Sequence, residues 1–173
     1  MHASLLLTAP DGELYSIERL AETPFSAEKM DAVFESTVRF TTPGQHIFLG
    51  MLDTSKPWSS GEHLGFGIKI DTEDGTITDM VNDLGVLDYI NSAPLPADTD
   101  IPIKISIEKQ NRVLIAQITV GTETFLHPAL YLDTIESLGA FGGTTILWGG
   151  TAQFFTSRMR ATDPFASGQT LPS

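Results

Sequence analysis

The sequence predicts an all-β protein made of antiparallel sheets, and residues 101–120 carry the strongest indication. Isoleucine occupies positions 101, 103, 105 and 107, and the residues between them are mostly polar. After a polar turn at residues 109–112, apolar residues return at positions 114, 116, 118 and 120. A period of two is the signature of a half-buried strand, so this segment predicts a hairpin with one face in a core.

The second indication is a series of shorter alternating segments separated by turn residues. Phe34, Val38 and Phe40 share one face of a strand that ends at the Pro43-Gly44 turn. An Asp-Gly turn over residues 71–75 separates two more strands. Together the pattern predicts roughly nine to eleven strands. The expected strands cover about residues 33–40, 46–52, 64–70, 76–81, 86–90, 101–108, 113–120, 124–132, 144–148 and 152–157.

The two ends of the chain carry weaker patterns. Residues 1–31 include Pro24, which interrupts any long helix, and Ser26, which would cap a single helical turn. We expect this segment to be irregular and to pack on a β-sandwich domain spanning residues 1–160. Residues 161–173 contain small and polar residues with two prolines and are expected to form a flexible tail. A chain of 173 residues fits a single domain.

Composition excludes several classes of function. Ten lysine and arginine residues against 22 aspartate and glutamate residues give a net charge of −12, which disfavours nucleic acid and acidic membranes as partners. The absence of cysteine excludes disulfides, thiolate zinc sites and a cysteine nucleophile. The Leu5-Leu6-Leu7 run is too short for a signal peptide, and no segment reaches the ~18 apolar residues of a membrane span. We therefore expect a soluble protein, with a cytoplasmic location favoured.

Several late motifs resemble the concanavalin A-like jelly-roll superfamily, and within it SPRY-type domains. They are HPALYL at residues 127–132, TILWGG at residues 145–150 and the pair Phe154-Phe155, together with the glycine of HIFLGML at residues 46–52. The resemblance covers roughly residues 33–157 and implies a two-sheet antiparallel β-sandwich that binds proteins or glycans.

The chain also departs from its presumed relatives. Leu147-Trp148-Gly149 stands where SPRY-type domains carry asparagine, phenylalanine and glycine. Residues 71–75 do not reproduce the metal loop of legume lectins, and the paired-acid strand of jelly-roll glycosidases is absent. These departures put a SPRY-like peptide site and glycoside hydrolysis in doubt.

Catalysis has little support in the residue pattern. Glu73 and Asp74 are adjacent, so their side chains point apart, whereas glycoside hydrolysis needs two carboxylates across a cleft. The Gly-x-Ser-x-Gly elbow of serine hydrolases is missing. The four histidines are scattered without the spacing of a helical zinc site.

Calcium is the one metal ion for which the sequence offers candidate ligands. Asp71, Asp74 and Asp79 lie close together in the sequence, and clustered carboxylates bind calcium. The alternative is that turns collect aspartate for backbone reasons alone. No other cofactor is expected.

The candidate ligand-binding residues lie in the loop DTSKPWSSGEH at residues 53–63. Trp58 is the proposed aromatic anchor, and it has Asp53, Glu62 and His63 as polar neighbours, with Tyr89 as a second candidate. The alternative is that Trp58 folds back over the end of the sandwich.

The favoured function is therefore a non-catalytic module that recognises a protein segment or a carbohydrate through its end loops. A structural or assembly protein that forms homo-oligomers through exposed strands is the second hypothesis. A jelly-roll hydrolase is the third and least favoured.

Overall fold

The structure is a computed structural model, and it describes most of the strands and the turns between them. The described residues are 3–9, 15–24, 31–54, 65–79, 89–90, 94–110, 113–130, 135, 137–145 and 150–162. Side chains are described for residues 31–54, 66–77, 94–109, 113–126, 135, 137–144, 151–155 and 157–161.

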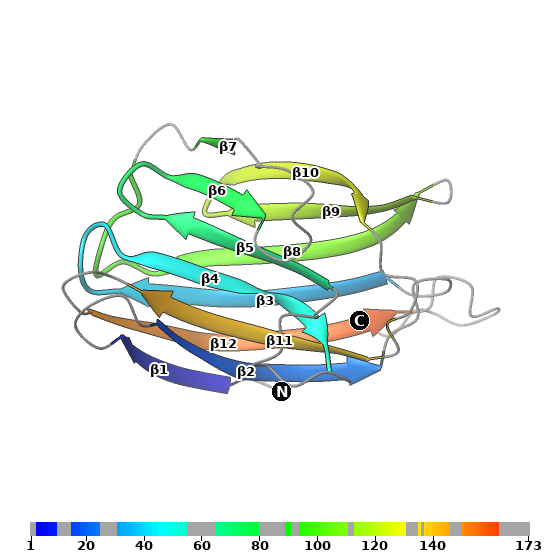
Figure 1. Cartoon of the computed structure of the whole chain (residues 1–173), viewed down its shortest axis with the longest axis horizontal. Coiled ribbons are helices and arrows are strands. Elements are labelled where there is room, and N and C mark those ends of the chain that lie inside the picture. Colours follow the sequence, from blue (N-terminus) through cyan, green and yellow to red (C-terminus); the bar gives the residue numbers. More distant parts are fainter. Residues whose placement is uncertain are drawn as a thin grey trace.

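Twelve strands form two antiparallel six-stranded sheets that lie face to face (Figure 1). Sheet A has the order β1 (Ala3–Ala9), β12 (Gly150–Thr162), β3 (Asp31–Phe40), β8 (Ile101–Gln110), β9 (Val113–Val120) and β10 (Glu123–Leu130). Sheet B has the order β2 (Tyr15–Pro24), β11 (Ser137–Thr145), β4 (His46–Asp53), β5 (Gly65–Asp71), β6 (Thr76–Asp79) and β7 (Tyr89–Ile90). This architecture confirms the predicted all-β antiparallel sandwich.

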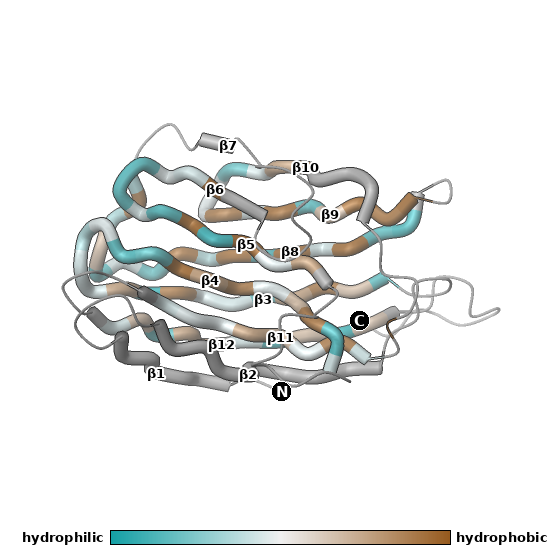
Figure 2. Tube along the Cα trace, in the orientation of Figure 1, coloured by the Kyte–Doolittle hydropathy of each residue, from teal (hydrophilic) through white to brown (hydrophobic). Residues whose placement is uncertain are grey.

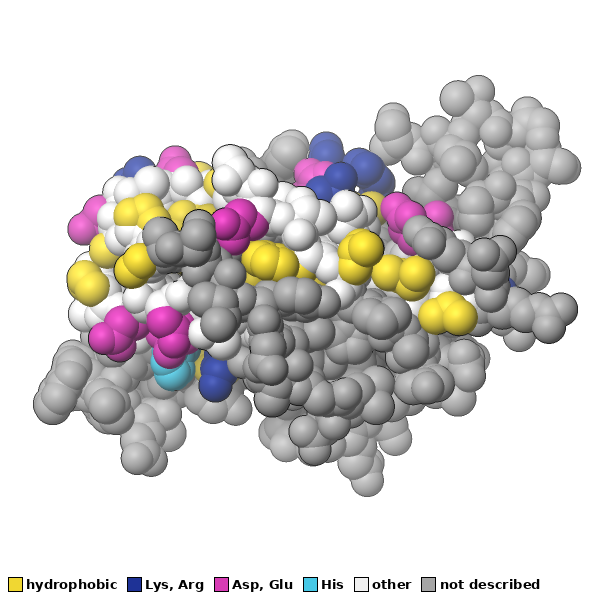
Figure 3. Space-filling view, turned by 90° about the horizontal axis from the view of Figure 1, so that it is seen from above, with side chains coloured by type: hydrophobic (Ala, Val, Ile, Leu, Met, Phe, Trp, Pro, Cys, Tyr) yellow, Lys and Arg dark blue, Asp and Glu magenta, His cyan; other side chains and the backbone are white. Residues whose placement is uncertain are grey.

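The core fills the space between the two sheets. Hydrophobic and hydrophilic residues alternate along the strands (Figure 2). From sheet A, Phe34, Ile105 and Phe154 are at most 1% exposed, and from sheet B, Phe66 and Ile68 are fully buried. All five side chains point inward, as alternation requires. Figure 3 looks onto the edge of the sandwich formed by β7 and β10, and it shows hydrophobic side chains in a line between charged ones.

The N-terminal expectation is wrong. Residues 3–9 and 15–24 are not irregular, because they form β1 and β2, which are edge strands of sheet A and sheet B. Their pairing partners, β12 and β11, come from the far end of the chain, so local pattern alone did not indicate them. The strand β12 also extends through Thr162, past the expected end of the sandwich at residue 160. Residues 163–173 lie outside the described part of the chain.

Strand β11 also differs from the prediction, which placed a strand at residues 144–148. The observed strand is Ser137–Thr145, with the sequence SLGAFGGTT. Glycine is depleted in strands because it has no side chain to pack, so this segment carries no strand signal. The packing of the outer face of sheet B explains why glycine is present here.

On that face each large side chain lies opposite a glycine. The pairs are Phe48 with Gly143, Phe141 with Gly50, and Leu52 with Gly139. A Cβ atom added to Gly50 would collide with the backbone oxygen of Phe66 and would lie 2.8 Å from Cε1 of Phe141. Phe48, Leu52 and Phe141 form a second hydrophobic cluster, which we call the outer cluster, and each is 8% exposed or less. This face is therefore closed to solvent at the outer cluster.

A buried glutamine joins three segments at one end of the sandwich. The side-chain amide of Gln45 donates to Thr144 Oγ1, and its amide oxygen accepts from the backbone N–H of Thr42 at 3.2 Å. The hydroxyl of Thr72 donates to the backbone oxygen of Gln45 at 2.6 Å. The carbonyl of Thr72 in turn accepts from the N–H of Leu95 at 3.0 Å. Buried polar groups need such partners, so this network fixes the loop geometry.

The exposed edge of sheet A is strand β10. Leu126 on this strand is 56% exposed, and Val113 on the neighbouring strand β9 is 41% exposed. Over the described residues, the structure contains no helix long and apolar enough to cross a membrane.

Candidate functional site

A row of polar side chains crosses the outer face of sheet A. Strand register places Arg158 of β12 beside Glu35 of β3, Glu35 beside Lys104 of β8, and Lys104 beside Thr119 of β9. Their neighbours along each strand, such as Phe34 and Ile103, are buried in the core. Alternation therefore forces the four polar side chains outward together. We call this set the polar row.

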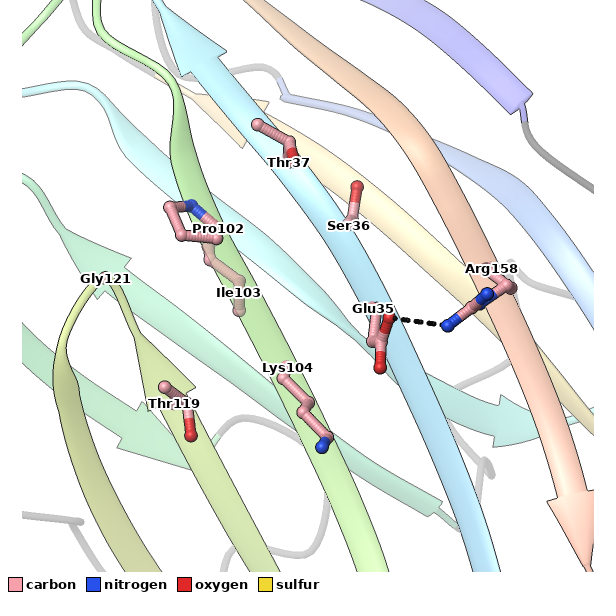
Figure 4. A pocket seen from close by; sticks show the side chains of 9 residues that line it. All are labelled: Glu35, Ser36, Thr37, Pro102, Ile103, Lys104, Thr119, Gly121 and Arg158. Atoms are coloured by element: carbon pink, nitrogen blue, oxygen red, sulfur yellow. Dashed lines mark hydrogen bonds and ion pairs between the residues drawn. The ribbon is translucent and has the colours of Figure 1, made fainter. Parts of the chain in front are cut away.

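The polar row lines a groove of about 430 Å³ on this face. Its volume lies within the range of about 300–1,000 Å³ typical of small-molecule sites. The full lining consists of Glu35, Ser36, Thr37, Pro102, Ile103, Lys104, Thr119, Gly121 and Arg158. Figure 4 shows Glu35 on β3 between Arg158 on β12 and Lys104 on β8, with Gly121 in the turn after β9.

Charge in the groove is unevenly paired. Arg158 Nη2 donates to Glu35 Oε2 at 3.1 Å, and both side chains are partly exposed. Lys104 has neither a hydrogen bond nor an ion pair to another described residue, and it is exposed. Two cations against one carboxylate leave the groove with a net charge of +1. It therefore offers charged donors, one carboxylate acceptor and the hydroxyls of its threonines.

The sheet beneath the groove is held rigidly. Ser36, which lines the groove, shares a buried hydrogen bond of 2.8 Å with Ser157 Oγ of β12. The β12 register shifts between Phe155 and Arg158, which marks a bulge at this point. Bulges redirect side chains, so the bulge sets where Arg158 meets Glu35. At the other end of the row, the hydroxyls of Thr119 and Thr124 lie 3.2 Å apart.

Most of the predicted loop site lies outside the described residues. This applies to Trp58, Glu62 and His63. Asp53 ends strand β4 and is only 6% exposed, so its carboxylate is not offered to a ligand as the prediction required. Tyr89 belongs to β7, where it pairs with Ile77, and its side chain is not described.

Two of the calcium candidates, Asp71 and Asp74, bind backbone amides of their own turn. Asp71 Oδ1 accepts the N–H of Glu73 at 2.9 Å, and Asp74 Oδ1 accepts the N–H of Thr76 at 2.8 Å. Asp79 pairs with Ile68 of β5, and its side chain lies outside the described part of the chain. Asp71 and Asp74 therefore have turn-forming roles, and the described residues include no group of three metal-ligating side chains.

Electrostatics around these turn aspartates fit a structural role. The N–H of Thr76 is the main reason that the pKa of Asp74 lies below its ordinary value, because a hydrogen bond to the charged form favours it. The other oxygen of Asp71, Oδ2, lies 3.5 Å from Nε2 of His46. Both aspartates thus stabilise the turn between β5 and β6.

The groove does not have the arrangement for glycoside hydrolysis. Glu35 is the only carboxylate among the residues that line it. Hydrolysis of a glycosidic bond in this way needs two carboxyl groups that face each other across the bond. The lining therefore lacks the second carboxyl group that this mechanism requires.

The local pattern of the sequence does not indicate the polar row as a site. Glu35 follows the apolar Phe34, and Lys104 lies between Ile103 and Ile105, so the period of two implies that both side chains face solvent, as the structure confirms. The local pattern could not place Arg158 and Glu35 together, because they are 123 residues apart in the chain. The only sequence signal was the outward parity of each residue taken separately.

Comparisons with known proteins support the fold. No family model matches the sequence, and no curated protein matches it. Among solved structures, the potassium-bound form of the Emp46p carbohydrate recognition domain matches with a TM-score of 0.61 and 10% identity, over 93% of this chain and 87% of that one.

Two further structures illustrate the range of matches. A Lotus tetragonolobus seed lectin matches with a TM-score of 0.58 and 12% identity, over 92% of this chain and 94% of that one. The carbohydrate binding module CBM66 from Bacillus subtilis matches with a TM-score of 0.54 and 14% identity, over 88% and 85%. At such low identity the likeness concerns the fold alone. The chain has the concanavalin A-like jelly-roll fold, and the narrower resemblance to SPRY-type domains stays a prediction.

Proposed function

We propose that this protein is a non-catalytic carbohydrate-binding module. The polar row is the observation that carries the proposal, because it places several hydrogen-bonding side chains on one rigid sheet. Sugar hydroxyls both donate and accept hydrogen bonds, and the row supplies donors, a carboxylate and hydroxyls within a single groove.

The fold gives the proposal a second support. The solved structures with this fold include a carbohydrate recognition domain, a seed lectin and a carbohydrate binding module. Their shared architecture is an analogy and assigns no residue in this chain. The groove therefore has to be tested by its own side chains.

The loop at residues 53–63 remains a second proposed contact region. Trp58 would stack its ring on the apolar face of a sugar, with Glu62 and His63 as polar neighbours. Stacking supplies affinity that hydrogen bonds exchanged with water do not. The burial of Asp53 removes that residue from the proposed contacts.

A glycan array with the whole chain tests the proposal. We expect the wild type to bind a restricted set of glycans, Trp58→Ala to weaken the signal, and the melting temperature to stay within about 2 °C. The array is run with calcium and with a chelator, because Asp71, Asp74 and Asp79 were calcium candidates. A wild-type array with no bound glycan would overturn the proposal and favour recognition of a protein segment.

Isosteric variants separate the groove from the loop. Thr119→Val removes a hydroxyl that lines the groove, whereas Thr122→Val makes the same change in the exposed turn after β9. We expect the first variant to lose roughly five-fold or more in affinity and the second to bind as the wild type does. Equal affinity for both variants would exclude Thr119 as a ligand contact.

Assembly of copies is a second candidate function, and the edge of sheet A favours it. Strand β10 has no neighbour on its outer side among the described strands, and Leu126 on this strand is 56% exposed. Exposed strand edges pair readily with other chains. A mass that rises with concentration in the wild type and not in Leu126→Lys would establish this candidate, whereas a constant mass would exclude it.

A further inference from the structure

We propose that the groove on sheet A selects saccharides that carry a carboxylate, such as uronic or sialic acids. This inference rests on the proposed function and names the class of glycan. The observation behind it is Lys104, a cation in the groove without a partner among the described residues.

Glu35 forms its ion pair with Arg158, so Lys104 can interact with a ligand in the groove. Arg158 already compensates the carboxylate of Glu35 at 3.1 Å, from the strand on the opposite side of β3. Lys104 is the cross-strand neighbour of Glu35 and makes no ion pair with it. An ammonium group with three donors therefore faces the groove, and no other described residue uses those donors.

The sign of the groove is opposite to that of the chain. The protein as a whole has a net charge of −12, whereas the groove has a net charge of +1. Long-range repulsion is screened beyond roughly 10 Å at 0.1 M salt, so an anion close to Lys104 experiences mainly the local charge. An acidic group on a ligand would find its complement in the groove.

The rest of the groove suits a sugar ring better than a free anion. Pro102 provides an apolar surface, and Thr37 and Thr119 provide hydroxyls at the positions beside Pro102 and Lys104 on the neighbouring strands. A ring carboxylate held by Lys104 would place its hydroxyls within reach of these groups. Charge-assisted hydrogen bonds are about twice as strong as neutral ones, so Lys104 would dominate selectivity.

Paired ligands test the proposal by calorimetry on the full chain. The first pair is a galacturonic acid trisaccharide and its neutral galactose counterpart, and the second pair is sialyllactose and lactose. We expect at least one acidic ligand to bind roughly ten-fold more tightly than its neutral partner at 0.05 M salt, with the preference smaller at higher salt.

Two lysine variants on the same strand provide the control. Lys104→Met removes the charge but keeps the length of the side chain, and it should lower the affinity for the acidic ligand to that for its neutral partner. Lys109→Met makes the same charge change outside the groove and should keep the preference. A preference that survives in Lys104→Met would overturn the inference.

The outcomes distinguish this inference from the proposed function. If glycans bind but the wild type holds acidic and neutral partners equally, the inference fails and carbohydrate binding stands. If no glycan binds on the array or in calorimetry, both fail, and the groove serves another ligand class.

Discussion

The outer faces of the two sheets differ in what their outward side chains contact. Sheet A exposes the polar row, so its outward positions remain open to water. Sheet B carries Phe48, Leu52 and Phe141 at its outward positions, and all three are buried. Each of these side chains lies opposite a glycine on the neighbouring strand.

The difference shows that alternation determines which side chains point outward. It does not determine whether those side chains meet solvent or a second packed layer. On sheet A the outward residues meet solvent and many of them are polar, so most substitutions there should cost little free energy of unfolding. On sheet B the outward residues form a second packed layer, in which large side chains fill the space above glycines. Substitutions should therefore cost far more free energy of unfolding on sheet B than at matched positions on sheet A.

The largest effect is expected at Phe141. Phe141→Ala should lower the free energy of unfolding by about 3–5 kcal/mol, because a 1% exposed ring leaves a cavity in the outer cluster. Phe155→Ala is the matched change on the outward side of sheet A, where the ring is partly exposed, and should cost about 1 kcal/mol. Denaturant titration measures both, and equal losses would contradict the comparison.

Gly50→Ala should be the next most harmful change. Its new Cβ would meet the backbone of Phe66 and would lie 2.5 Å from the Cα of Gly67, so strands must move apart. We expect a loss of about 3 kcal/mol. Gly121→Ala has open space but a φ of 63°, so only backbone strain of about 1 kcal/mol opposes it. Thermal melts of the two variants should differ clearly, and a smaller loss at Gly50 would refute the close packing.

A smaller effect is expected inside sheet A, beneath the groove. Ser157→Ala should cost about 1–2 kcal/mol because it leaves the buried hydroxyl of Ser36 without its partner. Removing both hydroxyls should cost less than the sum of the single changes. A double-mutant cycle by denaturant titration measures this coupling, and additive losses would show that the hydrogen bond contributes nothing.

The smallest expected effects are changes in how the free energy of unfolding depends on pH. These changes have opposite signs for an aspartate on sheet A and one on sheet B. Burial is the main cause that raises the pKa of Asp31 on β3, so the folded state binds this proton more readily than the unfolded chain does. The penalty on the charged form is complete at pH 7 and disappears as pH falls through the raised pKa. Asp31→Asn should therefore be slightly more stable than the wild type at pH 7, and this difference should shrink on acidification.

Asp74 in the sheet B turn should behave in the opposite way. Its pKa is lowered by the hydrogen bond from the N–H of Thr76, so its contribution is present above the unfolded value of 3.8 and is lost as pH falls through the folded pKa. Asp74→Asn should be less stable than the wild type at neutral pH and should approach it in acid. Denaturation midpoints between pH 3 and 7 test both signs, and parallel curves for the two variants would rule out this assignment.

Local alternation was enough to predict the middle of the fold. The hairpin of β8 and β9, and strands β3, β4 and β5, all lie close to their expected positions, because their apolar residues face a single core. Strand β11 was missed because three of its residues are glycines, two of which, Gly139 and Gly143, lie opposite large outward side chains of β4. Strand β2 was missed because its pairing with β11 spans most of the chain.

The groove could be predicted only in part, for a similar reason. Parity placed Glu35 and Lys104 in solvent, but their neighbourhood depends on register between strands far apart in sequence. The bulge in β12 that brings Arg158 beside Glu35 leaves no mark in the local pattern. The Trp58 loop stays a prediction because it lies outside the described residues.

Gln45 links segments that would otherwise move separately. It joins the turn after β3, the turn after β5 and, through Thr72, the segment at Leu95. The side-chain amide of Gln45 holds Thr42 and Thr144, and its backbone carbonyl holds Thr72, so displacement of the whole residue would release all three segments at once. This end of the sandwich should therefore open as a single cooperative unit with one opening free energy. The backbone amides of Thr42, Thr72 and Leu95 should then exchange their hydrogens with a shared protection factor, which makes the end a foldon centred on one residue.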